Sequence, residues 1–170
     1  MTAAPTSATL DTNVLQEFWR NQDKANVVRQ LLDFSDEGQI DLVVTTRISA
    51  DTPRLPLAER IDELPELGVG TIGSSFRLGV SSLGSKDMLV GPEAKELASF
   101  IEEHSRQLGH RKRQPDWRDQ DHLYGHMVER RDVFLTWDRG ILDLADALQG
   151  RFGLVVTTPD AFVARFAEGE

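Results

Sequence analysis

Two aspartates follow apolar runs that are typical of buried strands. Asp11 ends the stretch SATLD, and Asp138 follows FLTW immediately before a segment with helical spacing. The carboxyl ends of parallel strands meet at one edge of a sheet, where such folds bind their ligands. Carboxylates gathered there could hold Mg²⁺ or Mn²⁺, which prefer hard oxygen ligands. The structural alternative is that Asp11, Asn13 or Asp138 simply begins the next helix as an N-cap.

Further acids could reach the same edge. Asp51 ends TTRISAD, directly after a second buried strand, and Asp119 opens the helix DQDHLYGHMVERR. Asp119 shares a stripe with the apolar Leu123, four residues on, so we expect it to face inward. Asp121 lies about 200° around the helix from Asp119 and is expected to be solvated. It is the alternative to Asp119 as a metal ligand.

Two histidines on that helix have a spacing that zinc ligands can have. His122 and His126 are four residues apart, but no HExxH pattern accompanies them. We therefore expect them to pack or to form hydrogen bonds.

Alternating strands and helices must position these residues. Apolar, β-branched runs predict strands near 8–11, 40–46, 132–136 and 153–158. Helical spacing and Pro at helix starts predict helices over 14–19, 27–32, 92–108, 118–131, 140–149 and 159–167. This alternation predicts an α/β fold, a single three-layer α/β/α sandwich with a mainly parallel sheet of four or five strands.

The segment from about 52 to 91 fits the alternation poorly. It is rich in Gly, Ser and Pro, and FRLGV (76–80) alternates like a half-exposed strand. We expect one domain over 1–170 with an insertion here that carries a small hairpin. GVGTIG (68–73) matches a dinucleotide-binding pattern, but no helix opens after it, so its glycines indicate turns.

Composition limits the class of protein. The absence of Cys excludes disulfides and thiolate metal sites, and suits a reducing cytosol. The start MTAAPTSATL lacks the basic and apolar regions of a signal peptide, and no run approaches the roughly 20 apolar residues of a membrane span. We expect a soluble, cytoplasmic protein with no membrane partner.

The net charge of −9 hides a local reversal. The segment HSRQLGHRKRQPDWR (104–118) has five Arg or Lys residues against one Asp, a charge of +4. Such a segment could contact the phosphates of a nucleic acid beside a carboxylate site. The candidate contacts are Arg111, Lys112, Arg113 and Arg118. The alternative is a solvated loop with scattered charge.

Taken in order, these motifs resemble the PIN-domain ribonucleases. The match covers roughly 1–51 and 118–166, in LDTNVL (10–15), TTRISAD (45–51), DQDHL (119–123), FLTWDRGIL (134–142) and VVTTPDAF (155–162). The resemblance implies an acidic quartet of Asp11, Asp51, Asp119 and Asp138, with Asn13 and Thr136 as polar neighbours. The family usually has Glu on a continuing helix at the second position, whereas Thr52 and Pro53 follow Asp51 here.

The chemistry expected of such a quartet is phosphodiester hydrolysis. Converging carboxylates repel one another unless cations neutralise them. Bound Mg²⁺ or Mn²⁺ would activate water and offset charge on the departing oxygen. The resemblance implies RNA as substrate, the toxin of a toxin–antitoxin pair as the biological role, an antitoxin or other inhibitor protein as partner, and a homodimer. The alternatives are a metal-dependent phosphatase on small phosphorylated substrates and a degenerate PIN fold that acts as a protein-interaction module.

Overall fold

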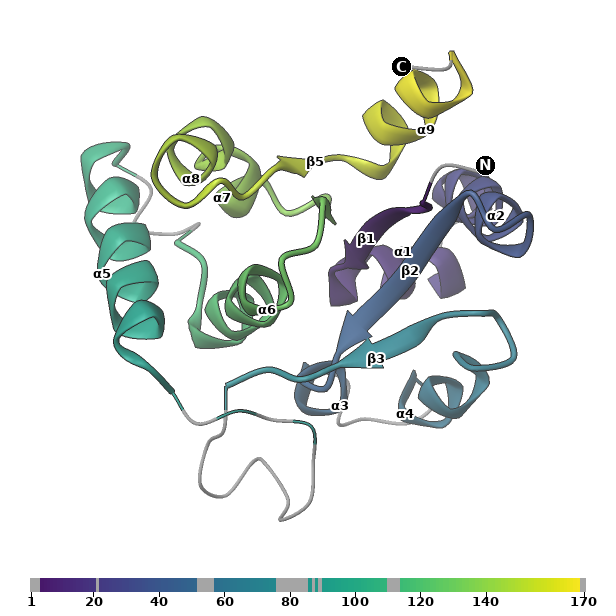
Figure 1. Ribbon diagram of the computed structural model, residues 1–170, viewed down its shortest axis with the longest axis horizontal. Helices are drawn as coiled ribbons and strands as arrows, with labels where there is room; N and C mark the ends of the chain where they lie inside the picture. Colours follow the sequence, from purple (N-terminus) through teal and green to yellow (C-terminus); the bar gives the residue numbers. More distant parts are fainter. Residues whose placement is uncertain are drawn as a thin grey trace.

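The chain folds as an α/β protein around a sheet in which all strands run parallel (Figure 1). The computed structural model describes residues 4–20, 22–51, 57–75, 86, 88, 90–109 and 114–168. Within these residues the sheet has five strands in the order β3-β2-β1-β4-β5. They are β1 (Thr6–Leu10), β2 (Ile40–Thr45), β3 (Gly70–Ile72), β4 (Val133–Leu135) and β5 (Val156–Thr157).

Helices connect and cover these strands. They are α1 (Thr12–Arg20), α2 (Gln22–Asp36), α3 (Ile48–Asp51), α4 (Leu57–Arg60), α5 (Pro92–Gln107), α6 (Trp117–Val128), α7 (Arg139–Leu142), α8 (Ala145–Phe152) and α9 (Pro159–Ala167), with a 3₁₀ turn η1 (Ile61–Glu63). Among the described residues, no helix has the length and apolar character needed to cross a membrane.

Two hydrophobic clusters lie on opposite faces of the sheet. Successive side chains of a strand point to opposite faces, so Leu135 packs in a cluster with α1, α2 and α9. Its neighbour Phe134 packs with α5, α6, α7 and α8. Figure 1 shows the two helical layers on either side of the strands. The predicted three-layer α/β/α sandwich is therefore confirmed.

The strand order reverses direction between β1 and β4. From β1 the chain moves outward to β2 and β3, and it later returns to the other side of β1 for β4 and β5. Leu10 pairs with Leu135, so β1 and β4 end side by side. Open α/β sheets bind ligands in the crevice outside the carboxyl ends of strands at such a reversal.

Three local expectations differ from the structure. The predicted helix over 140–149 is two helices, α7 and α8. The segment GVGTIG supplies β3, an edge strand that pairs only with β2 among the described residues, rather than turns alone. Part of the segment that we expected as an insertion thus belongs to the sheet, while FRLGV (76–80) lies outside the described residues.

Candidate active site

Asp11 is held at the end of β1 by two side chains. Its backbone N–H donates to the Leu135 carbonyl at 3.0 Å, which extends the pairing of β1 with β4. The Thr136 hydroxyl donates to Asp11 Oδ2 at 2.6 Å, and Asn13 Nδ2 donates to the same oxygen at 2.7 Å. The residue is only 3% exposed. These bonds fix the orientation of a carboxylate that burial alone would disfavour.

Thr136 links the two strand ends. Besides donating to Asp11, its Oγ1 accepts from Asn13 Nδ2 at 2.9 Å and from the Asp138 backbone N–H at 2.9 Å. A hydroxyl has one donor and two acceptor sites, and all three are used here. Asn13 completes the link because its Oδ1 accepts from the Trp137 N–H at 3.1 Å.

Asp138 caps α7. Its Oδ1 accepts from the backbone N–H groups of Gly140 at 2.6 Å and Ile141 at 3.2 Å. The N-cap alternative is thus what the structure shows for this oxygen. Among the described residues no hydrogen bond to Oδ2 is found. A cap and a ligand are therefore compatible roles for this one carboxylate.

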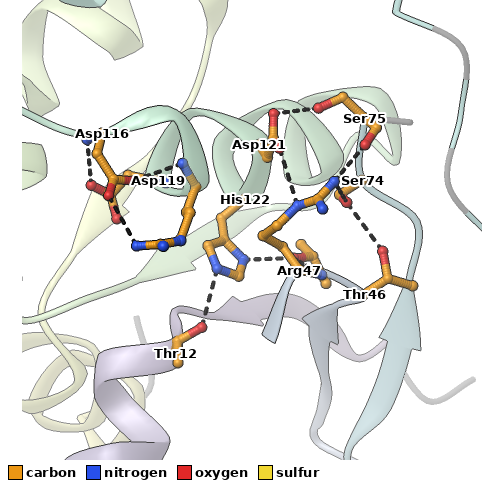
Figure 2. Close-up of polar contacts among 11 residues, drawn as sticks. Thr12, Thr46, Arg47, Ser74, Ser75, Asp116, Asp119, Asp121 and His122 are labelled. Carbon is orange, nitrogen blue, oxygen red and sulfur yellow. Dashed lines mark hydrogen bonds and ion pairs between the residues drawn. The ribbon is translucent and has the colours of Figure 1, made fainter. Parts of the chain in front are cut away.

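A pair of aspartates begins α6. Asp116 is the N-cap and accepts from the backbone N–H groups of Arg118 and Asp119, while Asp119 Oδ2 accepts from the Asp116 N–H at 2.8 Å (Figure 2). Sequence reasoning placed the helix start at 118 and missed Asp116. The spacing D-x-x-D resembles a capping box, and this was the signal that could have identified the residue.

Negative charge accumulates around Asp119. Burial, and after it the nearby charges of Asp11, Asp116 and Asp138, raise its pKa from 3.8 to about 7 against the lowering effect of the Asp116 backbone bond. The electrostatic effect shows that Asp11 and Asp138 lie close enough to Asp119 to repel its ionised form.

Two hollows share a wall made by Asp116, Asp119 and Asp138. The first, about 220 Å³, is lined by Asp11, Thr12, Asn13, Gln16, Asp116, Arg118, Asp119 and Asp138. The second, about 360 Å³, is lined by Gln114, Pro115, Asp116, Asp119, Asp138, Arg139 and Gly140. Three acids identified from the sequence, Asp11, Asp119 and Asp138, thus line one hollow. Arg139, which sequence reasoning did not single out, is an exposed cation on the second.

Asp121 faces away from these hollows. It is 2% exposed, forms an ion pair with the buried Arg47 (Nε to Oδ2, 3.1 Å) and accepts a hydrogen bond from Ser75 (Figure 2). The prediction that Asp121 is solvated is wrong, because α6 is covered on that side by the residues that follow β2 and β3. It lines a separate pocket with Ser75 and Tyr124, so the geometry favours Asp119 as the site acid.

The two histidines of α6 are buried and hydrogen-bonded, as expected. His126 Nδ1 lies 2.9 Å from Thr9 Oγ1. Burial, with a contribution from the charge of Arg131, lowers the pKa of His126 to about 4. His122 bonds to Thr12 and Thr45. Neither histidine lines the two hollows.

The donor set can be compared with the needs of a hard cation. Asp11, Asp119 and Asp138 offer only oxygen donors, as Mg²⁺ prefers, and the raised pKa of Asp119 marks charge that a cation would offset. Nowhere among the described residues do three or more His, Asp or Glu side chains form a ready arrangement for a metal ion. The Asp51 side chain lies outside the described residues; its backbone ends α3. The described acids have the oxygen donors that a hard cation prefers, but they do not form a complete coordination site.

The basic segment reaches the site at one end. Arg111, Lys112 and Arg113 lie outside the described residues. Arg118 lines the smaller hollow and pairs with Asp116 (Nη1 to Oδ2, 3.4 Å). Its Cζ lies 5.0 Å from the centre of the Trp117 ring. Arg106, at the other end, pairs with Glu102 on α5.

Neither a family model nor a curated protein matches this chain. The resemblance to PIN-domain ribonucleases thus rests on the sequence motifs, and the site is interpreted from its own geometry.

Proposed function

We propose that this protein is a metal-dependent ribonuclease of the PIN type, which hydrolyses RNA phosphodiester bonds. The observation that carries the proposal is that Asp11, Asp119 and Asp138 line one hollow beside the neighbouring ends of β1 and β4. That place is the reversal in strand order, where folds of this class bind their ligands.

The acids and their polar neighbours have distinct roles in the proposed reaction. Asp11, Asp119 and Asp138 would hold Mg²⁺ or Mn²⁺, and Asp51 is the proposed fourth acid. When bound, the ion supplies an activated water and offsets charge on the departing oxygen. Thr136 and Asn13 orient the Asp11 carboxylate through their hydrogen bonds to Oδ2.

The two hollows support a polymeric substrate. Two hollows adjoin at Asp116, Asp119 and Asp138, with Arg118 lining one and Arg139 lining the other. A polynucleotide that crosses the wall would place successive phosphates near both cations. A small phosphorylated molecule would need only one hollow, so this arrangement favours a nuclease over a phosphatase.

The preference for RNA, a cytoplasmic toxin role, an antitoxin or other inhibitor as partner, and a homodimer are proposed from the resemblance. The preference for RNA and the toxin role both require that the protein alone cleaves RNA when metal is present.

The test is incubation of the purified protein with a mixed RNA pool in Mg²⁺ or Mn²⁺, with a chelator as control. Single-stranded DNA and p-nitrophenyl phosphate are assayed in parallel. We expect metal-dependent shortening of the RNA. Hydrolysis of p-nitrophenyl phosphate with intact RNA would favour the phosphatase instead, and no metal-dependent hydrolysis of any substrate would contradict both enzymes.

A further inference from the structure

The buried ring of His122 connects α6 to the ends of two strands. Its Nε2 lies 3.1 Å from Thr12 Oγ1 (Figure 2). Its Nδ1 lies 2.5 Å from Thr45 Oγ1. The side chain is 1% exposed. Thr45 is the last residue of β2, and Thr12 is the first residue of α1.

The position of these contacts relative to the acids is specific. Thr12 directly follows Asp11 in the chain, and His122 lies three residues after Asp119, about one helical turn away. A path from Asp11 to Asp119 therefore runs through one peptide unit, one hydrogen bond and one turn of α6. The bond between Thr12 and His122 therefore connects the two elements that carry these carboxylates.

We propose that His122 is a positioning residue that sets the separation of the Asp11 and Asp119 carboxylates through its bond to Thr12. The inference rests on the proposed function, because it concerns how the same site is shaped. His122 itself contacts neither hollow. It acts on the ligands as the outer partners of metal ligands do, by holding the elements that carry them.

Other contacts hold α6 in place without His122. The ion pair between Asp121 and Arg47 ties the helix to the segment after β2. Further along, the backbone of Gly125 packs so closely on the Gly73 carbonyl that a Cβ would lie 2.5 Å from that oxygen. Because these contacts remain in a His122 variant, we expect it to fold, with the N-terminal turn of α6 free to shift.

The alternative is a purely structural role, in which His122 fills space and provides hydrogen-bond partners for buried hydroxyls. The two ring nitrogens allow the alternatives to be separated. The amide of Gln reaches about as far as Nε2 and can still bond Thr12, whereas the amide of Asn matches Nδ1 and can bond only Thr45. Thr12→Val and Thr45→Val remove the same two bonds from the other side.

The experiment compares His122→Gln, His122→Asn, Thr12→Val and Thr45→Val with the wild-type protein, and uses Thr12→Ser as the conservative control. Three quantities are measured: the melting temperature, the affinity for Mn²⁺ by titration calorimetry, and kcat and KM for RNA cleavage. If positioning is correct, His122→Asn and Thr12→Val lose roughly 10- to 100-fold in Mn²⁺ affinity or kcat. We expect Mn²⁺ affinity and kcat within about threefold of wild type for the three other variants, Thr12→Ser, His122→Gln and Thr45→Val. Loss of a hydrogen-bond partner that orients a metal ligand would have a larger effect.

Two results would overturn the inference in different ways. If Thr12→Val and His122→Asn bind Mn²⁺ and cleave RNA like wild type while melting at lower temperature, His122 is only structural and the proposed function stands. If the wild-type protein neither binds Mn²⁺ nor cleaves RNA, the proposed function fails and the inference fails with it.

Discussion

Thr136 donates a hydrogen bond to Asp11, 125 positions earlier in the chain, with 2.6 Å between Oγ1 and Oδ2. The same hydroxyl oxygen accepts from the Asp138 backbone N–H. One side chain thus joins the acid after β1 to the acid after β4. This contact depends on the parallel pairing of Leu10 with Leu135, which brings the two strand ends together.

Removing that hydroxyl should destabilise the protein. Thr136→Val keeps the shape of the fully buried side chain. It removes the hydrogen bond to Asp11 Oδ2 and leaves the Asp138 N–H without its acceptor. Such a loss costs about 1–3 kcal/mol. Urea unfolding measures it, with Thr136→Ser as the control that keeps the hydroxyl. Equal stability of the Val and Ser variants would contradict the role given to this hydrogen bond.

Asp119 should make the stability of the metal-free protein depend on pH. Its pKa is about 7 in the fold against an ordinary value of 3.8. Between these values the folded protein keeps a proton that the unfolded chain has lost, so the free energy of unfolding falls as pH rises from about 4 to about 7. Asp119→Asn removes this dependence.

We therefore expect the free energy of unfolding of Asp119→Asn to exceed that of the wild type above pH 7, by on the order of 2 kcal/mol. This figure is reduced for solvent screening and for the loss of a favourable negative charge at the N-terminus of α6. The measurement is urea unfolding at pH 5 and pH 8 in a chelator. A variant that is no more stable than wild type at pH 8 would refute the crowding of charge around Asp119.

Gly125 should be the position where α6 tolerates substitution least. A Cβ there would lie 2.5 Å from the Gly73 carbonyl oxygen and 3.2 Å from Thr45 Cγ2. Although Ala favours a helix over Gly by about 1 kcal/mol, the backbone contact should make Gly125→Ala destabilising. The matched control is Gly150→Ala in α8, where nothing lies within 4 Å of the added atom. We expect opposite shifts in melting temperature, and shifts of the same sign would contradict the close packing of α6.

Much of the fold could be predicted from the sequence because buried parallel strands are continuous apolar runs. IDLVVT and DVFLT are such runs, and they became β2 and β4. β3 could not be identified in this way, since Gly70, Thr71 and Ile72 make a short edge strand defined by its pairing with β2. Its partner, rather than its own residues, makes it a strand.

The candidate site was harder to predict where one helix is buried on several sides. Periodicity assigns a solvated face to α6, and on that basis Asp121 should be exposed. Residues 121 to 126 are instead buried without interruption. The burial of Asp121 depends on Arg47 and Ser75, which are 74 and 46 positions away in the sequence. No local pattern can report such a pairing.

Arg139 should contribute to RNA binding without taking part in the chemistry. It is exposed, lies on the larger hollow and follows Asp138 directly. Arg139→Gln removes the charge and should reduce the slope of log affinity against log salt by roughly 0.7 for a single-stranded RNA, the value for one lost phosphate contact. Fluorescence anisotropy at several salt concentrations measures the slope.

Arg151→Gln is the control for Arg139→Gln, because Arg151 is an exposed arginine on α8 that pairs with Glu96 on α5 and lies on neither hollow. We expect its salt slope to equal that of the wild-type protein. If Arg139→Gln also leaves the slope unchanged, the larger hollow does not receive a phosphate.

The most direct test of the proposed ribonuclease is Asp138→Asn, measured for both melting temperature and RNA cleavage in Mg²⁺ or Mn²⁺. Asn can still accept the bonds from Gly140 and Ile141, so the cap on α7 and the fold should survive. The lost negative charge should weaken a hard-cation site and with it the activation of water. We predict wild-type melting with cleavage abolished. Wild-type melting together with wild-type cleavage would show that Asp138 is only a helix cap and would contradict the proposed mechanism.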